Sequence, residues 1–360
     1  MSEKFKIKFS GGSYDVVIQG NSTTNIIKER SDLMVVDKKV DKLWENVQTN
    51  KSIKIEALET NKTLIKSIEV LNTLRELGAT RDSVLLVIGG GVIQDISTLC
   101  ASIYMRGIKW IYLPTTLLGM VDSCIGGKSS INIEKHKNLV GNFYPPTQVI
   151  VDTNFCKTLT EEQIVEGLFE AIKICYADSE EKLDNYLNLI DLNKSLYFLD
   201  FNKIVSLSLL TKKHFVEEDE FDNNIRLLLN FGHTFGHALE SASSFEIRHG
   251  VAVGLGMLCA YSTSISLGLM SDQNTRGLKL VAHILSLLKS IPNLSSIVSK
   301  IETQEAMKYF KGDKKHTDKQ FVLILFDKSG GLIRYKLDKS IKNRRILVNT
   351  FEGLRNINEI

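Results

Sequence analysis

Hydrophobic and polar positions follow two different patterns along the chain, and the change between them falls close to residue 153. In the first part, short apolar runs such as 33–37 and 83–88 alternate with stretches such as 64–77, where apolar residues recur at spacings of three and four. A short unbroken apolar run is typical of a strand buried on both faces, and the longer spacing is typical of an amphipathic helix. This alternation predicts a parallel sheet flanked by helices.

The strand pattern occurs at several places before residue 152. The expected strands are residues 5–9, 14–18, 33–37, 51–58, 83–88, 109–113 and 147–151, with Gly11 and Gly12 as the turn between the first two. The helix expected at 64–77 places Leu64, Ile68, Leu71, Leu74 and Leu77 on one face and ends at Gly78.

After Asp152 the chain shows mainly helical spacing. The expected helices are residues 161–177, 199–216, 226–243, 249–268 and 273–289, followed by a hairpin over 320–337. The sequence therefore predicts two domains, an α/β domain at residues 1–156 and a mainly helical domain at residues 157–360.

Composition narrows the class of protein. Of 360 residues, 43% are hydrophobic and 24% are charged, with a net charge of +3, which is ordinary for a globular protein and too mild to indicate nucleic acid or membrane as a partner. No apolar run reaches about 18 residues, so no membrane span is expected. The five cysteines are scattered without a CxxC pair, and the first residues lack an apolar signal region. Both features indicate the cytoplasm.

Three of the seven histidines lie close together in the sequence, at His233, His237 and His249. On a helix, the first two lie one turn apart on the same face. Such a cluster favours a divalent metal such as zinc. The alternative is that one or more of them is a buried, hydrogen-bonded histidine without a ligand role. Arg226 and Asn230 precede the histidines at helical spacing, which places them on the same expected face.

Other polar stretches are typical of anion binding. Gly89–Gly91 joins an expected strand to a helix, where backbone N–H groups can approach a phosphate, although a tight turn explains the glycines equally well. Asp37 follows another strand and suits either a ribose hydroxyl or a helix cap. Glu170 and Lys173 are three apart, and their spacing alone favours an exposed ion pair.

Six ordered motifs resemble those of the 3-dehydroquinate synthase family, which are sugar-phosphate cyclases. They are GGGVI with Asp95, PTTLL with the VDS and GGK residues that follow, GL-x-E-x-IK, R-x-x-LN-x-GHT-x-GHA-x-E, HG-x-AV-x-x-GM, and DKK at 313–315. The resemblance covers essentially the whole chain, with identifiable motifs from about Glu59 to Lys315.

The resemblance implies a Rossmann-like NAD-binding domain and an α-helical metal- and substrate-binding domain, with the active site in the cleft between them. The implied reaction converts 3-deoxy-D-arabino-heptulosonate 7-phosphate into 3-dehydroquinate and phosphate in the shikimate pathway of aromatic amino-acid biosynthesis. Oxidation at C5 by NAD acidifies the neighbouring C–H, so phosphate is lost by β-elimination. The ketone is then reduced again, and the opened ring closes by an aldol reaction. A divalent metal, zinc or cobalt, polarises the oxygen being oxidised.

The resemblance also assigns roles to residues. The implied metal ligands are Glu170, His233 and His249, and His237 becomes a group for substrate binding and proton transfer. The implied substrate-binding and catalytic residues are Lys173, Lys212, Arg226, Asn230, Asp122, Lys128, Lys315 and Arg106. Arg106 matches an arginine that reaches the phosphate from a neighbouring subunit, which implies a homodimer. The implied NAD-binding residues are Asp37, Glu59, Lys62, Gly90, Gly91, Asp95, Thr115, Thr116, Lys137, Asn138, Phe155 and Thr158.

Several positions differ from the family pattern, namely Gln94, His136, Gln163, Asp222 and Val251. These differences leave open a related cyclase that acts on another phosphorylated sugar, such as sedoheptulose 7-phosphate. A metal-dependent polyol dehydrogenase and a non-enzymatic homologue are further alternatives.

Overall fold

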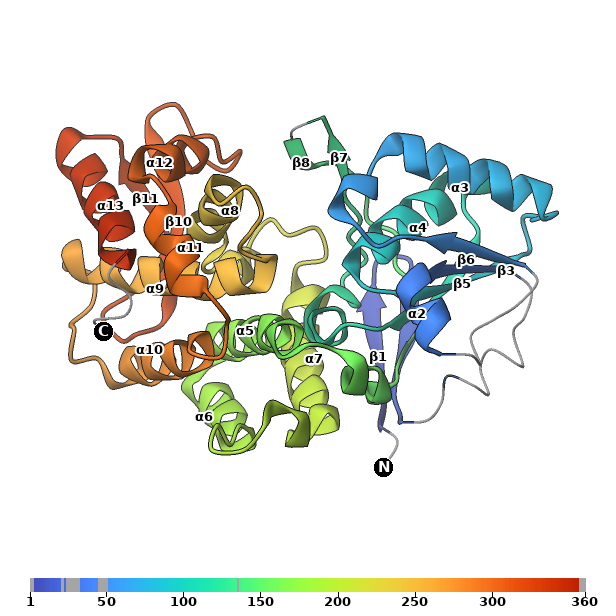
Figure 1. Ribbon diagram of the computed structural model, residues 1–360, viewed down its shortest axis with the longest axis horizontal. Coiled ribbons are helices and arrows are strands. Elements are labelled where there is room, and N and C mark those ends of the chain that lie inside the picture. The colour runs from blue at the N-terminus through green and yellow to red at the C-terminus, as the bar shows by residue number, and fades with distance from the viewer. Residues whose placement is uncertain (1–2, 21–22, 24–32, 45–50, 135, 356–360) are drawn as a thin grey trace. The chain divides into compact units, whose positions relative to one another are not determined.

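The computed structural model describes residues 3–20, 23, 33–44, 51–134 and 136–355 (Figure 1). It forms two compact units. The first comprises residues 1–159 and 200–221, and the second comprises 160–199 and 222–360. Helix α7 (Phe201–Glu218), which the sequence analysis grouped with the helical domain, packs on β1, β2 and the turn at 119–123 of the first unit.

A seven-stranded sheet with the order β1-β2-β9-β6-β5-β3-β4 forms the centre of the first unit. Every neighbouring pair in it is parallel except β1 and β2. The strands are β1 (Glu3–Phe9), β2 (Gly12–Ile18), β3 (Leu33–Asp37), β4 (Ser52–Ile55), β5 (Val84–Gly89), β6 (Lys109–Pro114) and β9 (Gln148–Val151). The expected α/β fold is confirmed, and each predicted strand is present.

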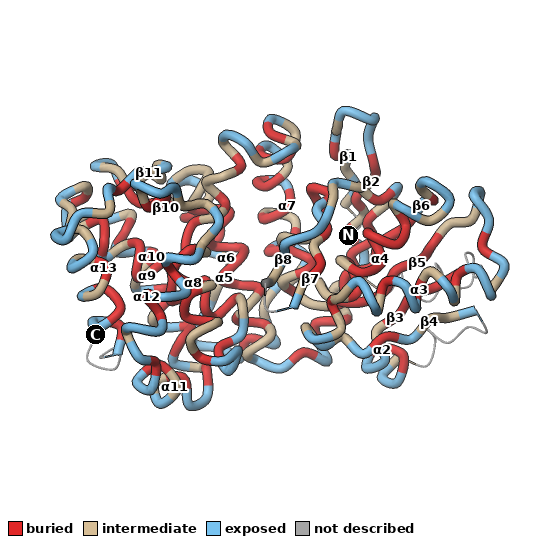
Figure 2. Tube along the Cα trace, turned by 90° about the horizontal axis from the view of Figure 1, so that it is seen from above, coloured by how far each residue is buried: buried red, intermediate tan, exposed pale blue. Residues whose placement is uncertain are grey.

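The apolar runs are buried because helices cover the sheet. Buried residues dominate β3, β5 and β6 (Figure 2). The helices of this unit are α2 (Lys38–Leu43), α3 (Leu64–Glu76), α4 (Gly91–Ile103) and α7, with short helical turns at Glu59–Asn61, Tyr104–Arg106 and Thr153–Thr158. The predicted face of α3 is wrong in part. Its buried residues are Ser67, Val70 and Leu74, whereas Leu64 and Ile68 are exposed.

The chain changes direction across the sheet between β3 and β5. From β3 it moves outward to β4, then returns and continues from β5 through β6 to β9. In a parallel sheet, ligands bind outside the carboxyl ends of the strands at such a switch point. The loops that follow β3 and β5 therefore flank the expected position of a ligand.

Two short elements beside this edge were not predicted. The turn η4 (Gly119–Ser123) is a π-helix, and β7 (Ile131–Ile133) pairs with β8 (His136–Val140) as a small hairpin. π-Helical turns occur mostly at functional sites.

Helices make up most of the second unit, as the sequence predicted. They are α5 (Glu161–Asp178), α6 (Glu180–Leu189), α8 (His233–Ala242), α9 (His249–Ser266), α10 (Thr275–Leu288), α11 (Leu294–Lys300), α12 (Thr303–Lys311) and α13 (Ile341–Leu354), with short turns at Leu196–Phe198 and Ile225–Asn230. The predicted hairpin is β10 (Gln320–Phe326) with β11 (Leu332–Asp338).

One predicted helix is wrong. Residues 226–243 do not form a continuous helix, because the 3-10 turn η7 (Ile225–Asn230) ends before α8 begins at His233. Between them Gly232 adopts a left-handed conformation with φ of 78°, which only glycine adopts readily. Arg226 and Asn230 therefore do not share a helical face with the histidines.

The described residues contain no helix long and apolar enough to cross a bilayer. All five cysteines are buried, and none is in a disulfide.

Candidate active site

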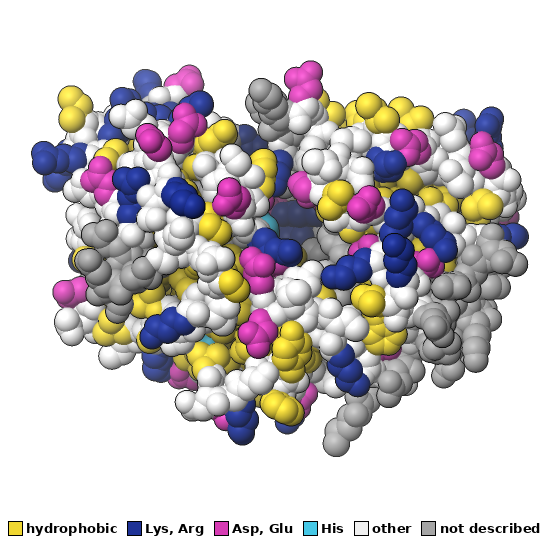
Figure 3. Space-filling view, in the orientation of Figure 1, with side chains coloured by type: hydrophobic (Ala, Val, Ile, Leu, Met, Phe, Trp, Pro, Cys, Tyr) yellow, Lys and Arg dark blue, Asp and Glu magenta, His cyan; other side chains and the backbone are white. Residues whose placement is uncertain are grey.

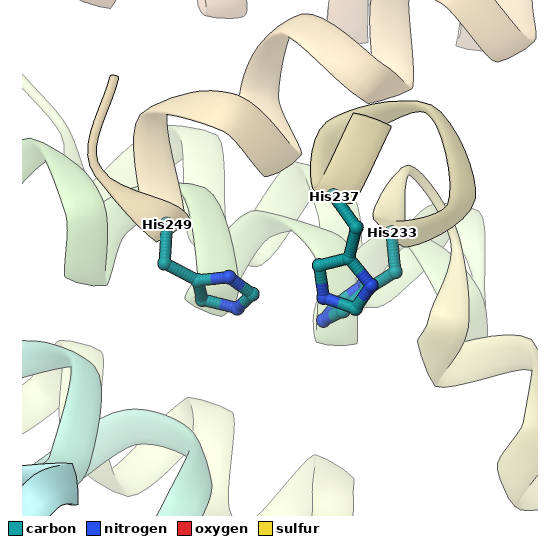
Figure 4. Close-up of side chains that lie close together, drawn as sticks. All are labelled: His233, His237 and His249. Atoms are coloured by element: carbon teal, nitrogen blue, oxygen red, sulfur yellow. The ribbon is translucent and has the colours of Figure 1, made fainter. Parts of the chain in front are cut away.

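The histidine cluster is built from the first turns of α8 and α9. His233 is the first residue of α8, His237 lies one turn later, and His249 is the first residue of α9. Their imidazole rings point into one space, and every pair of ring centroids is 5.4 Å apart (Figure 4). The three side chains can place one nitrogen each within 4.8 Å of the other two, which is compatible with a shared metal ion.

Close backbone packing holds these two helices together. A Cβ atom added at Gly256 of α9 would lie 2.0 Å from the carbonyl oxygen of Gly232, and one at Gly236 of α8 would lie 2.7 Å from that of Ala252. Larger residues would force the helices apart. The glycines therefore set the separation between the turns that present the histidines.

Glu170 on α5 lies against the same cluster. Its Oε1 atom is 3.8 Å from Nε2 of His233 and 3.7 Å from Nε2 of His249. The glutamate side chain is 1% exposed, and Oε1 has no hydrogen-bond partner among the described residues. Ligand atoms on a tetrahedral zinc ion are about 3.3 Å apart. The two separations from Oε1 exceed that value by only about 0.4–0.5 Å.

The outer nitrogens of the two histidines are already engaged. Nδ1 of His233 lies 3.2 Å from the carbonyl oxygen of Phe231, and Nδ1 of His249 lies 3.4 Å from Oε2 of Glu240. Donation from Nδ1 to these oxygens leaves the Nε2 lone pairs directed at Glu170. A buried carboxylate oxygen without a donor and two available imidazole nitrogens fit a divalent cation, and this supports Glu170, His233 and His249 as ligands.

Lys173 partners the other oxygen of Glu170. The two side chains form an ion pair within α5, and both are almost completely buried. The exposed ion pair that their spacing alone favoured is therefore wrong. A buried charged pair needs further partners to offset its desolvation, and the free Oε1 atom shows where one is missing.

His237 differs electrostatically from His249. Burial, reinforced by the nearby charges of His249 and Lys315, lowers the pKa of His237 to about 3. Burial also lowers the pKa of His249, but the hydrogen bond and charge of Glu240 outweigh it and raise that pKa overall. His237 is thus a neutral imidazole that can accept a proton. Lys315, whose Nζ is 3.1 Å from Oδ2 of Asp313, contributes a positive charge beside it.

The turn η7 holds the two remaining predicted residues of this unit. Arg226 is buried with 3% exposure, and Nδ2 of Asn230 donates to the carbonyl oxygen of Leu227 at 3.1 Å. The helix break at Gly232 separates both from the regular helical spacing of the histidines.

In the first unit, several residues predicted for NAD form a hydrogen-bonded network. Nζ of Lys62 is 2.9 Å from Asp95 and 3.6 Å from Glu59. Asp95 accepts from the backbone N–H of Ser130 at 3.0 Å and from its hydroxyl at 3.1 Å. Nδ2 of Asn132 donates to Glu59 at 2.8 Å.

The hairpin β7–β8 joins this network. Oδ1 of Asn138 accepts from the hydroxyl of Ser130 at 2.8 Å, and Oδ1 of Asn132 accepts from the backbone N–H of Asn138 at 2.9 Å. Lys137 lies beside Asn138 on β8. The structure therefore brings together Glu59, Lys62, Asp95 and Asn138.

The glycine turn and the loop after β6 are also adjacent. A Cβ atom on Gly90 would lie 2.9 Å from Cγ2 of Thr116, and the N–H of Thr115 donates to the carbonyl oxygen of Gly89 at 3.1 Å. Gly91 begins α4. Bare backbone at the start of a helix, beside two hydroxyl side chains, is suited to phosphate groups.

Three other predicted NAD residues have local structural roles. Asp37 caps α2, since its Oδ1 accepts from the N–H of Lys39 at 2.9 Å. Phe155 is 1% exposed and packs on Trp44, with ring centroids 4.7 Å apart. The hydroxyl of Thr158 donates to the carbonyl oxygen of Phe155 at 3.0 Å. Phe155 and Thr158 follow β9, and no hydrogen bond or ion pair joins them to the network around Asp95 among the described residues.

Asp122 and Lys212 form the polar centre of the predicted substrate contacts in this unit. Nζ of Lys212 is 2.8 Å from Oδ1 of Asp122 and donates to the carbonyl oxygen of Ile125 at 3.1 Å. Lys128 is exposed, with Nζ 6.0 Å from the ring centroid of Phe143. Arg106 is exposed in a left-handed conformation with φ of 65°, which is unusual for a residue with a Cβ atom.

Two of the family departures have clear structural explanations. Gln94 is buried and makes two hydrogen bonds to Ser123. Its Nε2 donates to the backbone oxygen, and its Oε1 accepts from the hydroxyl, both at 2.7 Å. The side chain thus connects the first turns of α4 to the turn that carries Asp122. Gln163 completes a capping box with Thr160 at the start of α5.

The other departures are less informative. Val251 is buried in α9, Asp222 has a positive φ of 59°, and the side chain of His136 lies outside the described part of the chain.

Sequence reasoning did not identify Glu240, Ser130 or Asn132. Glu240 follows His237 by three residues, so its helical spacing placed it near the histidines. Ser130 and Asn132 follow the GGK residues, but nothing in their spacing indicated that a hairpin would return them to Asp95.

Comparison with solved structures shows which proteins share this fold. A 2-deoxy-scyllo-inosose synthase complexed with carbaglucose-6-phosphate, NAD⁺ and Co²⁺ matches with a TM-score of 0.78 and 22% identity, covering 96% of this chain and 99% of that chain. ValA, a 2-epi-5-epi-valiolone synthase from Streptomyces hygroscopicus subsp. jinggangensis with NAD⁺ and Zn²⁺ bound, matches with a TM-score of 0.79 and 24% identity, covering 95% and 97%. The chain therefore shares its fold with this group of synthases.

Sequence comparisons define the family within this group. Models of the 3-dehydroquinate synthase N-terminal and C-terminal regions match residues 52–166 and 167–316. A 3-dehydroquinate synthase from Dictyoglomus turgidum is 33% identical over 367 residues, covering 98% of this chain and 98% of that protein. The chain belongs to the 3-dehydroquinate synthase family, which confirms the resemblance drawn from its motifs and the expectation that it is an enzyme.

Proposed function

We propose that this chain is a 3-dehydroquinate synthase that uses NAD and a divalent metal, zinc or cobalt. It converts 3-deoxy-D-arabino-heptulosonate 7-phosphate into 3-dehydroquinate and phosphate. The observation that carries the proposal is Oε1 of Glu170, which is buried, has no hydrogen-bond partner among the described residues and lies within 3.8 Å of two imidazole Nε2 atoms. Family membership supplies the substrate and the reaction.

The chain's own groups divide the work between binding and proton transfer. Glu170, His233 and His249 hold the metal, which supplies Lewis-acid polarisation of the substrate oxygen when bound. Arg226, Lys212, Lys173 and Asn230 bind the carboxylate and hydroxyl groups, while Lys128, Lys315 and Arg106 bind anionic groups including the phosphate. Asp122 accepts from a hydroxyl group near the reacting carbons.

Residues at the carboxyl end of the sheet would hold NAD, which would supply hydride-transfer chemistry when bound. The glycine turn presents backbone N–H groups to its phosphates, and the network around Lys62 and Asp95 presents fixed donors and acceptors to its polar groups. Lys137, Asn138, Asp37 and the residues after β9 complete the proposed set.

His237 is the proposed acceptor in proton transfer. Its lowered pKa keeps the imidazole neutral near pH 7, so it can take a proton from a substrate hydroxyl without first losing one. The positive charge of Lys315 beside it favours an anionic leaving group in the same region.

The direct test supplies the heptulosonate phosphate to the purified full-length chain with NAD and Zn²⁺ or Co²⁺. We expect release of phosphate in equal amount with 3-dehydroquinate and no net formation of NADH. Inertness with this substrate and turnover of sedoheptulose 7-phosphate would overturn the proposal in favour of the related cyclases. Net accumulation of NADH would instead identify a polyol dehydrogenase, and absence of both NAD and metal binding would identify a non-enzymatic homologue.

A homodimer in the cytoplasm is proposed for the working enzyme. Exposed apolar residues on and after α3 and α4 support an interface, since Ile65, Ile68, Ile103 and Met105 are each 50–72% exposed. Five buried cysteines without a disulfide support a reducing compartment. The mild net charge of +3 supports a small-molecule enzyme without nucleic acid or membrane as a partner.

The dimer is tested by light scattering and by mixing two inactive variants. If Arg106 acts from a neighbouring subunit, Arg106→Ala mixed with His237→Ala regains activity, because some mixed dimers contain one intact site. A monomeric mass, or no regain after subunit exchange, would exclude this arrangement.

A further inference from the structure

A second basic site lies on the second unit, at residues that the proposed reaction does not use. Lys311 at the end of α12, Lys339 after β11 and Arg344 on α13 line a surface cavity of about 140 Å³ together with the ring of Phe321. One water molecule needs roughly 10–15 Å³ by this measure, so the cavity has room for a group of several atoms.

The three cationic side chains have no acidic partner. Neither Lys311, Lys339 nor Arg344 forms an ion pair or a side-chain hydrogen bond among the described residues. Nearby acids are engaged elsewhere, because Asp338 accepts from the N–H of Ser340 at 2.9 Å and Asp313 pairs with Lys315. Nζ of Lys339 lies 5.1 Å from the ring centroid of Phe321, which positions its charge over the aromatic face.

A histidine lies beside the same ring. His316 and Phe321 have ring centroids 5.1 Å apart. Nδ1 of His316 accepts from the N–H of Val322 at 3.1 Å, so Nε2 carries the hydrogen. Lys339 and His316 therefore both place N–H groups close to the ring of Phe321.

The sequence around the cavity carries a local excess of positive charge. Between residues 305 and 345 there are twelve Lys and Arg residues and five Asp and Glu residues, although the whole chain has a net charge of only +3. Lys and Arg side chains, with Asp and Glu side chains among them, lie over α12, α13 and β11 at the upper left of Figure 3.

The start of α13 adds to this charge instead of offsetting it. Its first turn contains no acidic residue, and Lys342, Arg344 and Arg345 lie in its first five positions. Cations near a helix N-terminus oppose the helix dipole, so the arrangement is unfavourable unless an anion is close. Such local conflict is expected at binding sites.

We propose that this cavity binds a small polyanion, either a phosphorylated metabolite or a polycarboxylate. One anionic group fits among Lys311, Lys339 and Arg344, and the ring of Phe321 forms an apolar wall beside it. Arg344 suits a planar two-point contact with phosphate or carboxylate, whereas the two lysines supply compact charges. The proposal is independent of the reaction assigned to the chain.

The test measures binding of pyrophosphate and of citrate, in separate titration-calorimetry experiments, to the full-length chain saturated with NAD and loaded with one equivalent of Zn²⁺, from which free metal has been removed because both probes chelate it. Saturation fills the cofactor sites, and a Lys315→Gln background shows whether the proposed substrate-phosphate site contributes. We expect saturable binding of one of the two probes, unchanged by Lys315→Gln. The double variant Lys339→Gln, Arg344→Gln should weaken binding of that probe by at least about tenfold for each charge removed. Each hydrogen bond to a charged group contributes about that much to affinity.

The matched control is Lys342→Gln with Arg345→Gln. It removes the same charge from the same region but leaves the cavity lining intact, so it should weaken binding by less than about threefold, through long-range charge alone. Equal losses in both double variants would show only a general basic surface and overturn the proposal. Loss of probe binding in Lys315→Gln would assign the anion to the reaction site and overturn the proposal. Absence of binding by either probe would also overturn the proposal. Tighter pyrophosphate or tighter citrate binding distinguishes the phosphorylated from the carboxylate ligand.

Discussion

The network around Asp95 and the metal site around Glu170 differ in how many of their polar groups have hydrogen-bond or ion-pair partners before any ligand binds. Around Asp95, each charged group has a partner, with Lys62 between Glu59 and Asp95 and with Ser130 donating to the carboxylate. Around Glu170, one buried carboxylate oxygen has no donor among the described residues, and two imidazole nitrogens face it. The Asp95 network is therefore fully paired in the protein alone, and a cofactor can only add contacts to it. The Glu170 site lacks one partner, which a cation would supply.

The difference predicts that the two sites respond differently to the loss of a residue. Removing a member of a finished network leaves its partner buried and unpaired, so stability falls. Removing a member of an incomplete site mainly removes ligand affinity, because the protein alone gains little from that group.

The largest expected effect is at His249. His249→Ala should abolish stoichiometric zinc binding, because it removes one of three ligands, whereas His237→Ala should retain zinc and lose turnover. Metal content after dialysis and the visible spectrum of the Co²⁺ form measure this directly.

His214→Ala is the control, since His214 is exposed and its contacts to Glu218 and Phe215 lie on its own helix. Equal loss of metal in the His237 and His249 variants would show that the metal is held by three histidines, and that His237 is a ligand.

Lys62→Met tests the finished network. It leaves Asp95 without its cation, and we expect the free energy of unfolding to fall by about 3 kcal/mol, with weaker NAD binding. Urea unfolding and NAD titration measure the two effects. Lys66→Met removes an exposed ion pair to Glu69 on the same stretch of chain and should change stability by less than about 1 kcal/mol. Comparable losses in both variants would contradict the contrast between the sites.

His283 shows how burial alone, at a histidine outside the metal site, affects the pKa and the pH dependence of stability. Burial lowers its pKa to about 4, and its Nε2 atom is 3.3 Å from the hydroxyl oxygen of Tyr186. The unfolded chain takes up this proton near pH 6.5 and the folded chain does so only near pH 4. Stability is therefore lost as the pH falls through that window, by up to about 3 kcal/mol.

His283→Phe should remove this part of the acid sensitivity while metal content stays unchanged. Unfolding of both proteins at pH 7, 6, 5 and 4 provides the comparison. If the free energies of unfolding of the wild type and the variant differ by the same amount at every pH, His283 has the same pKa in the folded and unfolded states.

Glu240→Gln gives the smallest expected change. The amide still contacts Nδ1 of His249 but carries no charge, so zinc affinity should fall by about 10- to 100-fold while the ligand set stays the same. Competition with a chelator measures the affinity, and an unchanged Co²⁺ spectrum shows that the coordination is preserved. An unchanged affinity would show that Glu240 does not orient His249.

Periodicity in the sequence was sufficient to predict most elements of the fold. The run at 83–88 became a strand buried on both faces, and the helices at 161–177 and 249–268 agree closely with α5 and α9. Periodicity failed where tertiary contacts override it. Leu64 and Ile68 follow the helical spacing, but the buried face of α3 is formed by Ser67 and Val70.

The candidate site was predictable in its residue types but not in its division of roles. Spacing grouped His233 with His237 and favoured an exposed ion pair for Glu170, because spacing contains no information about which helix packs opposite. Only the resemblance placed Glu170 with the histidines, and the orphaned Oε1 atom supports that placement. The break at Gly232 also depends on a single left-handed residue, which apolar periodicity does not reveal.

The contact of Gly232 with Gly256 has a further consequence. Where two helices meet through bare backbone, no side chain lies between them to change rotamer, so their relative position has few alternatives to sample. The imidazoles at the starts of these helices are thus held close to coordinating positions in advance, and an incoming cation has little conformational entropy to overcome. A larger residue at Gly256 would shift His233 and His249 at the same time and disturb the whole site. Replacing a ligand residue would therefore change the metal preference with less disruption than altering the helix spacing.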